Sequence, residues 1–223
     1  PVADARTNVI GLLRVLDGAL VGGARKVVFA SSGGTIYGEA DPAPLPFDED
    51  TPQRPLSPYG VAKLAGGLYL EVYGSLHGLA GTTLALANVY GPRQDPNGEA
   101  GVVAIFAGLL LSGRPCTVFG TGEQIRDFVY VADVADSLLA AAERGDGQLF
   151  NIGTGVGTSV NDLYRTMAAI VGGPDDPERG SARPGELDRS VLDATRAAGE
   201  LGWRPVTGLD DGLQATLDWF SDR

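Results

Sequence analysis

Short apolar runs alternate with amphipathic stretches along most of the chain, and this pattern predicts an α/β protein with a mostly parallel sheet. Runs rich in β-branched residues are typical of buried strands. We expect strands at residues 26–30, 82–88, 116–119, 127–131, 148–152 and 190–192. Helical periodicity predicts helices over residues 9–20, 57–76, 102–111, 134–143, 160–171 and 209–220.

Segments rich in turn-forming residues separate these elements. Residues 31–38 are predicted to be a loop at the carboxyl end of the first strand, and residues 39–55, with their prolines and acidic residues, a solvated surface loop. The composition changes near residues 91–101, which predicts a domain of residues 1–91 and a second of residues 92–223. Within the second, residues 126–155 are expected to be able to pack back on the first sheet.

Composition and charge restrict the class of function. The 223 residues carry a formal net charge of −11, which argues against nucleic-acid binding, although local basic sites can still hold a small anion. One cysteine excludes an internal disulfide and the single histidine argues against a histidine-based metal site, so we expect a reducing, cytoplasmic compartment and no metal. The longest apolar stretch, residues 101–113, is too short to span a membrane.

The pair with the clearest chemical meaning is Tyr59 and Lys63, four residues apart on a predicted helix that begins at Ser57-Pro58. A nearby ammonium stabilises a phenolate, so such a tyrosine can act as a general acid and base. Taken alone, the same spacing is more typical of a surface pair. Strands that end at Ser32 and Asn88 flank this helix, and ligands of open α/β sheets bind beyond the carboxyl ends of strands.

Several segments resemble, in the same order, the extended short-chain dehydrogenase/reductases. The resemblance is strongest to the nucleotide-sugar epimerases, in particular the group that acts on UDP-glucose. It rests on SSGGTIYG at residues 31–38, SPYGVAK at 57–63, ANVYGPRQ at 87–94, RDFVYV at 126–131, FNIGTG at 150–155, RPGE at 183–186 and LGWRP at 201–205. The expected fold is a Rossmann-type doubly wound parallel sheet, without its first strands, followed by a smaller α/β substrate-binding domain.

The resemblance implies an NAD-dependent interconversion of UDP-glucose and UDP-galactose by transient oxidation at the sugar C4. Tyr59 would exchange the proton of the 4-hydroxyl, Lys63 would hold the nicotinamide ribose and tune Tyr59, and Ser32 would bind the reacting oxygen. The resemblance also assigns residues to the cofactor, namely Asn8, Ala30, Ser31, Tyr59, Lys63 and Ala87.

The position of the catalytic hydroxyl has two solutions in the sequence. When the loop is compared with the family's motif backward from Tyr37, Gly33 falls at the position of the hydroxyl residue. When it is compared forward from the preceding strand, Ser32 falls there. We choose Ser32, because glycine has no hydroxyl, and Thr35 is the second candidate. Related 4,6-dehydratases carry an Asp-Glu pair beside this residue, and Gly33-Gly34 cannot supply their acid and base, so epimerisation fits better.

The resemblance implies a second set of residues for the UDP-sugar. Arg126 and Arg183 would bind the diphosphate, Glu186 the ribose, Val102 and Val103 the nucleotide, and Thr117 and Phe119 the uracil, although the last four suit an ordinary core equally well. Ser32, Tyr59 and Asn88 would contact the sugar. The small Ser190 would leave room for an N-acetyl group.

Residues 153–157, GTGVG, look like a dinucleotide fingerprint, but position 158 is Thr, so we interpret Thr158 and Ser159 as helix capping residues. The family's Gly-rich turn is expected to precede Pro1 in a longer protein, and the chain alone to hold NAD poorly and be inactive. The helix of Asn8 and the helix of Tyr59 are expected to form a homodimer interface. Another nucleotide-sugar epimerase or reductase, or a non-catalytic sugar-nucleotide-binding fragment, stays open as an alternative.

Overall fold

The computed structural model describes residues 1–39, 44–97, 101–183, 185 and 187–222. The helices are α1 (Val2–Ala5), η1 (Arg6–Ile10), α2 (Gly11–Val21), α3 (Gly33–Ile36), α4 (Pro58–His77), α5 (Val102–Leu111), α6 (Val131–Glu143), α7 (Val160–Val171), η2 (Ala197–Leu201) and α8 (Leu209–Ser221). The strands are β1 (Lys26–Ser32), β2 (Ala80–Leu86), β3 (Asn88–Tyr90), β4 (Thr117–Phe119), β5 (Ile125–Tyr130), β6 (Gln148–Ile152), β7 (Gly157–Ser159), β8 (Glu178–Gly180) and β9 (Arg189–Ser190).

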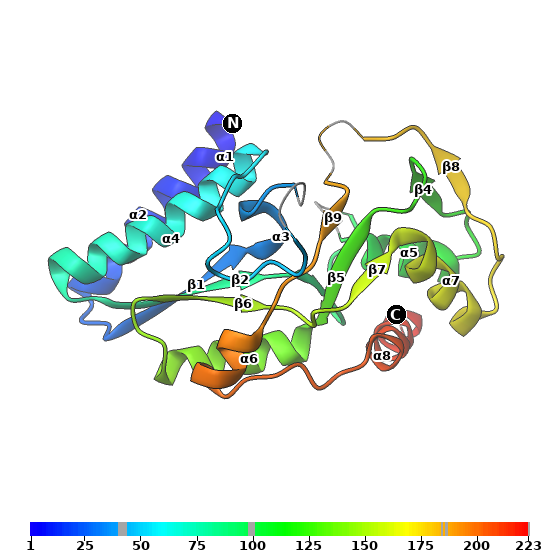
Figure 1. Ribbon diagram of the computed structural model, residues 1–223. Coiled ribbons are helices and arrows are strands. Elements are labelled where there is room, and N and C mark those ends of the chain that lie inside the picture. Colours follow the sequence, from blue (N-terminus) through cyan, green and yellow to red (C-terminus); the bar gives the residue numbers. More distant parts are fainter. Residues whose placement is uncertain (40–43, 98–100, 184, 186, 223) are drawn as a thin grey trace.

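The first part of the molecule is built on a parallel sheet with the strand order β1-β2-β6. Helices α2 and α4 cover one face and α6 covers the other, which gives three layers (Figure 1). The predicted parallel α/β fold is therefore confirmed. Although β6 lies more than 60 residues after β2 in the sequence, it pairs with β2 in register, for example Leu84 with Phe150.

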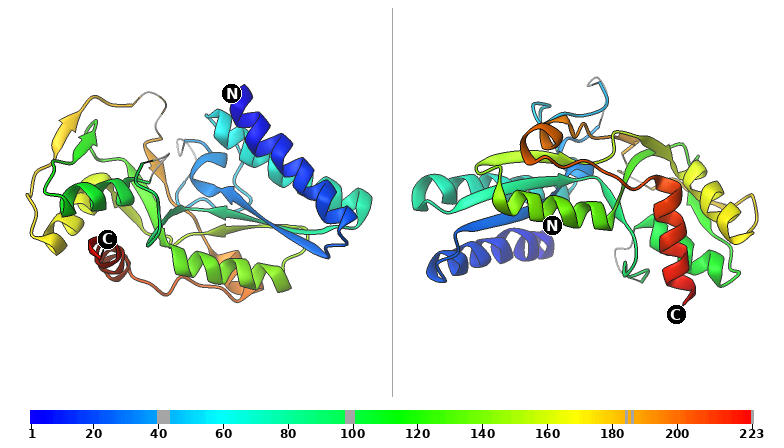
Figure 2. Two further views of the ribbon diagram at one scale, coloured as in Figure 1. Left: turned by 180° about the vertical axis from the view of Figure 1, so that it is seen from behind. Right: turned by 90° about the horizontal axis from the view of Figure 1, so that it is seen from below.

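The second part contains shorter strands and three helices. Strand β5 pairs in parallel with β3 and β9 and antiparallel with β7, while β4 pairs with β8. Helices α5, α7 and α8 pack against one another over a core that includes Phe106, Tyr164 and Leu213 (Figure 2). The division of the chain at residue 91 stays a prediction.

Helix α4 begins and ends where its sequence predicts. The Ser57 hydroxyl accepts a hydrogen bond from the Gly60 N–H at 3.0 Å, and Pro58 occupies the first turn, where its missing N–H needs no partner. At the other end Gly78 has a φ of 69°, a left-handed conformation that favours glycine. The chain before β1 is helical from Val2 to Val21, in agreement with its apolar stripe.

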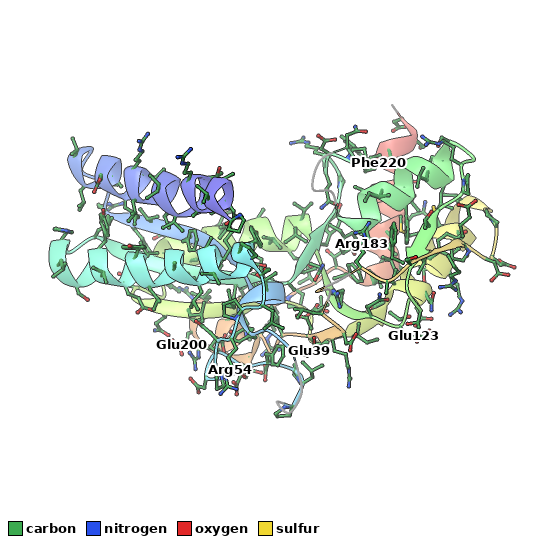
Figure 3. The ribbon with its side chains drawn as sticks, turned by 90° about the horizontal axis from the view of Figure 1, so that it is seen from above. Glu39, Arg54, Glu123, Arg183, Glu200 and Phe220 are labelled. Carbon is green, nitrogen blue, oxygen red and sulfur yellow. The ribbon has the colours of Figure 1, made fainter. Side chains whose placement is uncertain are left out.

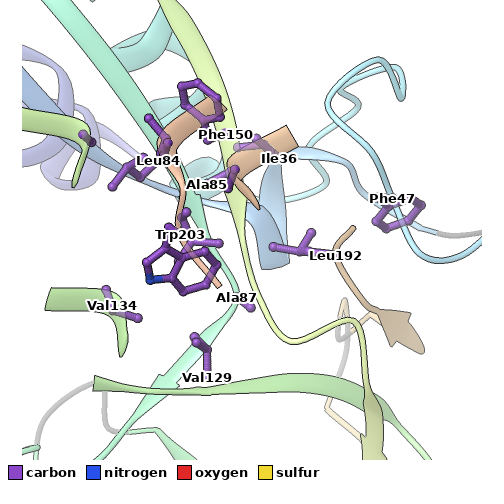
Figure 4. Packing of buried hydrophobic residues seen from close by; sticks show 14 of the residues in the cluster. Ile36, Phe47, Leu84, Ala85, Ala87, Val129, Val134, Phe150, Leu192 and Trp203 are labelled. Carbon is purple, nitrogen blue, oxygen red and sulfur yellow. The ribbon is translucent and has the colours of Figure 1, made fainter. Parts of the chain in front are cut away.

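The principal core packs β2 and β6 of the sheet against α3, α6 and η2. Leu84 and Phe150 from the sheet pack with Ile36, Leu192 and Trp203, all nearly inaccessible to solvent (Figure 4). The Trp203 indole N–H donates to the main-chain oxygen of Asp133 at 2.7 Å, so its one polar atom is satisfied. Segments far apart in the sequence thereby hold the end of β1 in place.

Three predictions about loops and strands are wrong. Residues 31–38 are not all loop, because β1 continues to Ser32 and α3 follows. Residues 44–55 are not simply solvated, since Phe47 is 1% exposed and pairs with Leu192. The strand predicted over 82–88 is broken at Ala87, whose N–H donates to the Ile152 oxygen at 2.9 Å and turns the chain from β2 into β3.

Within the described ranges, no helix is both long and apolar enough to cross a membrane. The same residues contain no cluster of three histidine, cysteine or acidic side chains placed to bind a metal ion.

Candidate functional site

A cavity of about 470 Å³ opens where β1 and β2 end, between the two parts of the molecule. Its described lining includes six of the residues that the sequence pointed to, namely Ser32, Thr35, Tyr59, Ala87, Asn88 and Arg126. These residues come from four separate segments of the chain. The carboxyl ends of the two strands bring them together, as expected for an open α/β sheet.

Tyr59 and Lys63 lie on the face of α4 that looks toward the end of β1. The Lys63 ammonium is 5.5 Å from the centre of the Tyr59 ring, and it donates a hydrogen bond to the Ala30 oxygen at 3.0 Å. Tyr59 is 39% exposed and lines the cavity, whereas Lys63 is not among the described lining residues. The spacing of four residues therefore makes the two side chains neighbours.

Burial lowers the pKa of Lys63, and the negative charge of Asp4 partly opposes that shift. Asp4 also accepts a hydrogen bond from the Asn8 side-chain amide at 3.2 Å. Asn8 is thus brought near Lys63 through a shared neighbour on the helix before β1. It does not belong to the described cavity lining.

At and after the end of β1, Ser32 and Thr35 line the cavity. Ser31 is buried and its hydroxyl donates to the Lys63 main-chain oxygen at 3.2 Å, which ties β1 to α4. Gly33 faces the core, because a Cβ there would lie 2.4 Å from a Leu192 methyl carbon. A side chain at position 33 could not reach the cavity, so the geometry favours Ser32 over position 33.

Arg126 carries positive charge to the cavity wall. Its Nη1 donates to the Ile125 oxygen at 2.9 Å and to the Asp188 oxygen at 3.4 Å, which fixes the direction of the guanidinium. Among the described lining residues it is the one charged side chain. In a chain with a formal net charge of −11, a cavity whose described charge is positive is suited to an anionic ligand.

The residues predicted to bind the nucleotide lie outside the described lining of this cavity. Val103 is 1% exposed within the second core and Val102 packs against that core, so a role at the site would fall to their main chain. The Arg183 guanidinium lies 4.0 Å from the centre of the Phe119 ring. Figure 3 shows Arg183 in the second part, away from Arg54 and Glu200 on the first.

Four further residues were predicted for the site, namely Thr117, Ser190, Ala30 and Glu186. Thr117 is half-buried at the start of β4, and Ser190 is buried in β9 beside Arg126. Ala30 contributes its main-chain oxygen to Lys63. Glu186 lies outside the described residues.

The cavity also includes residues that our sequence reasoning did not select. Leu56 and Leu187 are apolar lining residues, and Gln94 is a polar one. The Gln94 amide nitrogen donates to the Val89 oxygen at 3.3 Å, which braces the segment after β3. Gln94 was part of the ANVYGPRQ segment, so its signal was present but carried no assigned role.

The Gly-rich segment at 153–157 does not offer its amides to a ligand. The buried Asp127 carboxylate accepts hydrogen bonds from the Thr154 and Gly155 N–H groups at 2.9–3.1 Å. Burial raises the pKa of Asp127, and these hydrogen bonds partly oppose that shift. The segment fastens β5 to the end of β6.

Comparison with known proteins identifies relatives of this chain. Residues 1–153 match the NAD dependent epimerase/dehydratase family. A UDP-glucose 4-epimerase of Mycolicibacterium smegmatis is 48% identical over 100% of this chain and 71% of its own length. The crystal structure of UDP-glucose 4-epimerase with UDP-glucose from Thermotoga maritima has a TM-score of 0.97 and 46% identity, covering 100% of this chain and 72% of that one.

A UDP-glucose 4-epimerase of Thermus thermophilus in complex with NAD has a TM-score of 0.90 and 42% identity, covering 97% of this chain and 70% of that one. The family match covers well over half of this chain, and the similarity to the first relative extends over the whole length of this chain. The chain therefore belongs to the NAD dependent epimerase/dehydratase family.

Proposed function

We propose that the complete protein is an NAD-dependent 4-epimerase that interconverts UDP-glucose and UDP-galactose. The observation that carries the proposal is the meeting of Ser32, Tyr59 and Asn88 with Arg126 in one cavity, with Lys63 behind Tyr59. The names of the relatives that align over the whole chain support the same reaction.

The residues at the end of β1 fit the nicotinamide end of NAD. The Lys63 ammonium is half-buried beside Tyr59 and offers donors to ribose hydroxyls, and Asn8, which donates to Asp4, adds a polar side chain on the helix before β1. Lys63, Tyr59, Asn8 and the segment from Ala30 to Ser31 would hold this end. When bound, NAD supplies reversible acceptance of a hydride from the sugar carbon.

The protein's own task is then to bind the substrate and move one proton. Tyr59 accepts the proton of the sugar 4-hydroxyl as that carbon is oxidised and returns it after reduction on the other face. Ser32 donates a hydrogen bond to the same oxygen and Lys63 stabilises the phenolate. Arg126 binds the diphosphate, with Arg183 as a second cation from the neighbouring segment.

The described lining favours epimerisation over dehydration. Elimination of water from the sugar needs an acid and a base besides the tyrosine. The described part of the lining contains no carboxylate, and the two residues after Ser32 are glycines. A reversible oxidation at one carbon needs no such group.

The test is an assay of the purified complete protein. We expect it to retain NAD and to convert UDP-glucose into UDP-galactose and the reverse, and to accept N-acetylated sugars where the small Ser190 leaves room. A panel that includes dTDP-sugars separates this function from another epimerase or a reductase of the family. A complete protein without NAD and without interconversion of any nucleotide sugar would contradict the proposal.

We also propose a homodimer formed by the helices before β1 and by α4. Ile10 and Val15 on the first, and Leu68, Val72 and Leu76 on α4, are 46–72% exposed despite being apolar. A pair of such helices from each subunit would bury these side chains. Sedimentation should give a dimer, and a Leu68→Glu variant a monomer. We propose a cytoplasmic location, because a chain with one cysteine suits a reducing compartment. We propose a role in galactose metabolism, because UDP-galactose is a proposed substrate.

A further inference from the structure

Ser32 and Thr35, which both carry a hydroxyl, line the cavity. The Thr35 hydroxyl donates to the Ser32 main-chain oxygen at 3.3 Å. Because a hydroxyl has one proton, Thr35 Oγ1 then meets a ligand with its lone pairs, as an acceptor. The Ser32 hydroxyl has no hydrogen-bond partner among the described residues, so its proton is available to a ligand.

We propose that Thr35 determines sugar specificity by accepting a hydrogen bond from a hexose hydroxyl on a carbon next to the reacting one. This inference rests on the proposed function. The reacting oxygen loses its proton and becomes a carbonyl oxygen, so it needs donors, which Ser32 and Tyr59 supply. The neighbouring hydroxyl keeps its proton throughout, so it needs an acceptor, which Thr35 supplies.

The spacing of the two residues suits neighbouring sugar oxygens. Ser32 precedes α3 and Thr35 lies three residues later, on the same side of this single helical turn. The hydrogen bond from Thr35 Oγ1 to the Ser32 main-chain oxygen, at 3.3 Å, holds the Thr35 hydroxyl next to residue 32. A hexose that presents its reacting oxygen to Ser32 therefore presents an adjacent hydroxyl to Thr35.

The acceptor is held rigidly against the helix of Tyr59. Gly60 allows α4 to approach the Thr35 main chain closely, because a Cβ at position 60 would lie 2.8 Å from the Thr35 oxygen. On its other side α3 rests on Leu192 through Gly33. Thr35 thus keeps one position relative to Tyr59, which is what discrimination between substrates requires.

The experiment uses the complete protein with UDP-glucose and with two analogues that keep the reacting 4-hydroxyl. The 3-deoxy analogue lacks the hydroxyl on the carbon next to the reacting one, and the 6-deoxy analogue is the control, because its missing hydroxyl is two carbons away. Thr35→Val removes the hydroxyl at constant shape, and Thr35→Ser retains it. We expect Thr35→Val to lower kcat/KM for UDP-glucose by about tenfold. With the 3-deoxy analogue, wild type and Thr35→Val should have equal kcat/KM, whereas with the 6-deoxy analogue the tenfold difference should remain. Thr35→Ser should behave as wild type.

A merely structural role would give a different pattern. If Thr35→Val lowers kcat/KM equally for all three substrates, or for none, the inference is overturned while the epimerase function stands. Thr35→Ala, read in the same way, serves if Thr35→Val does not fold. A wild-type protein that does not interconvert UDP-glucose and UDP-galactose overturns the proposed function and this inference together.

Discussion

Two groups of predicted site residues differ sharply in where the fold puts them. The sugar wall, by which we mean Ser32, Thr35, Tyr59, Ala87 and Asn88, lies entirely on one cavity. The nucleotide group, by which we mean Val102, Val103, Thr117, Phe119 and Arg183, lies outside its described lining. The first group follows strand ends and a helix start. The second lies on a core helix, a short strand and an irregular segment.

The difference follows from how each group is held. Paired parallel strands fix where their ends lie, so residues one or two positions beyond β1 and β2 must share an edge. No such rule fixes Arg183, whose neighbours in the described chain are irregular. The largest effects of substitution are therefore expected at the sugar wall.

The largest effect is expected for Tyr59→Phe. Removing the hydroxyl takes away the group that exchanges the substrate proton, so kcat should fall by about 10²- to 10⁴-fold with little change in KM. Tyr69→Phe is a matched control, because Tyr69 lies on the same helix and is also 39% exposed. Steady-state kinetics of both variants test this. Equal activity of Tyr59→Phe and wild type would remove Tyr59 from the reaction.

The next effect compares the two arginines. Arg126 lines the cavity and Arg183 does not, so Arg126→Gln should weaken UDP binding by about 10- to 100-fold and Arg183→Gln by less. Calorimetric titration of the complete protein with UDP measures both. A larger loss for Arg183→Gln would mean that the segment of Arg183 carries the diphosphate and that the described cavity is only the sugar end.

Much of the fold was predictable because its signals are local. Ser57-Pro58 and Gly78 delimit α4, and runs of β-branched residues mark β1 and β2. By contrast β7 was missed, since Gly157–Ser159 has little strand propensity and is held by pairing with β5, more than 25 residues away.

The same limit applies to the site. The Tyr59–Lys63 pair is a matter of helix spacing and could be predicted. Ser32 could be chosen over position 33 because glycine has no hydroxyl, but the contact of position 33 with Leu192, a residue far later in the chain, could not be predicted. Burial of Phe47 and Glu49 likewise depends on distant partners, Leu192 and Asn151.

A smaller effect concerns the support behind the sugar wall. The Glu49 carboxylate is 3% exposed, accepts a hydrogen bond from the Asn151 N–H at 2.7 Å and lies 3.6 Å from Arg196. Burial raises its pKa above the ordinary 4.5, although the hydrogen bonds and Arg196 oppose the shift. The folded state therefore binds this proton more tightly than the unfolded state, and stability falls as the pH rises through the folded pKa.

Glu49→Gln removes that titration. We expect its free energy of unfolding, relative to wild type, to rise by about 1 kcal/mol between pH 4 and pH 8, measured by urea unfolding at several pH values. Asp50→Asn is the control, since Asp50 also contacts Arg196 but is 83% exposed, and its difference from wild type should change little with pH. A pH-independent difference for Glu49→Gln would contradict the assignment.

The smallest effect sharpens the comparison at the nucleotide group. The Arg183 guanidinium faces the Phe119 ring at 4.0 Å, and an exposed contact of this kind contributes about 0.5–1 kcal/mol. Phe119→Leu should therefore weaken UDP binding by only about two- to fivefold. If the ring acts by holding Arg183, the loss disappears in the Arg183→Gln background, because the double-mutant cycle then shows full coupling. If the loss persists there, Phe119 contacts the base itself, and the nucleotide group is a true second wall of the site rather than a support for one arginine.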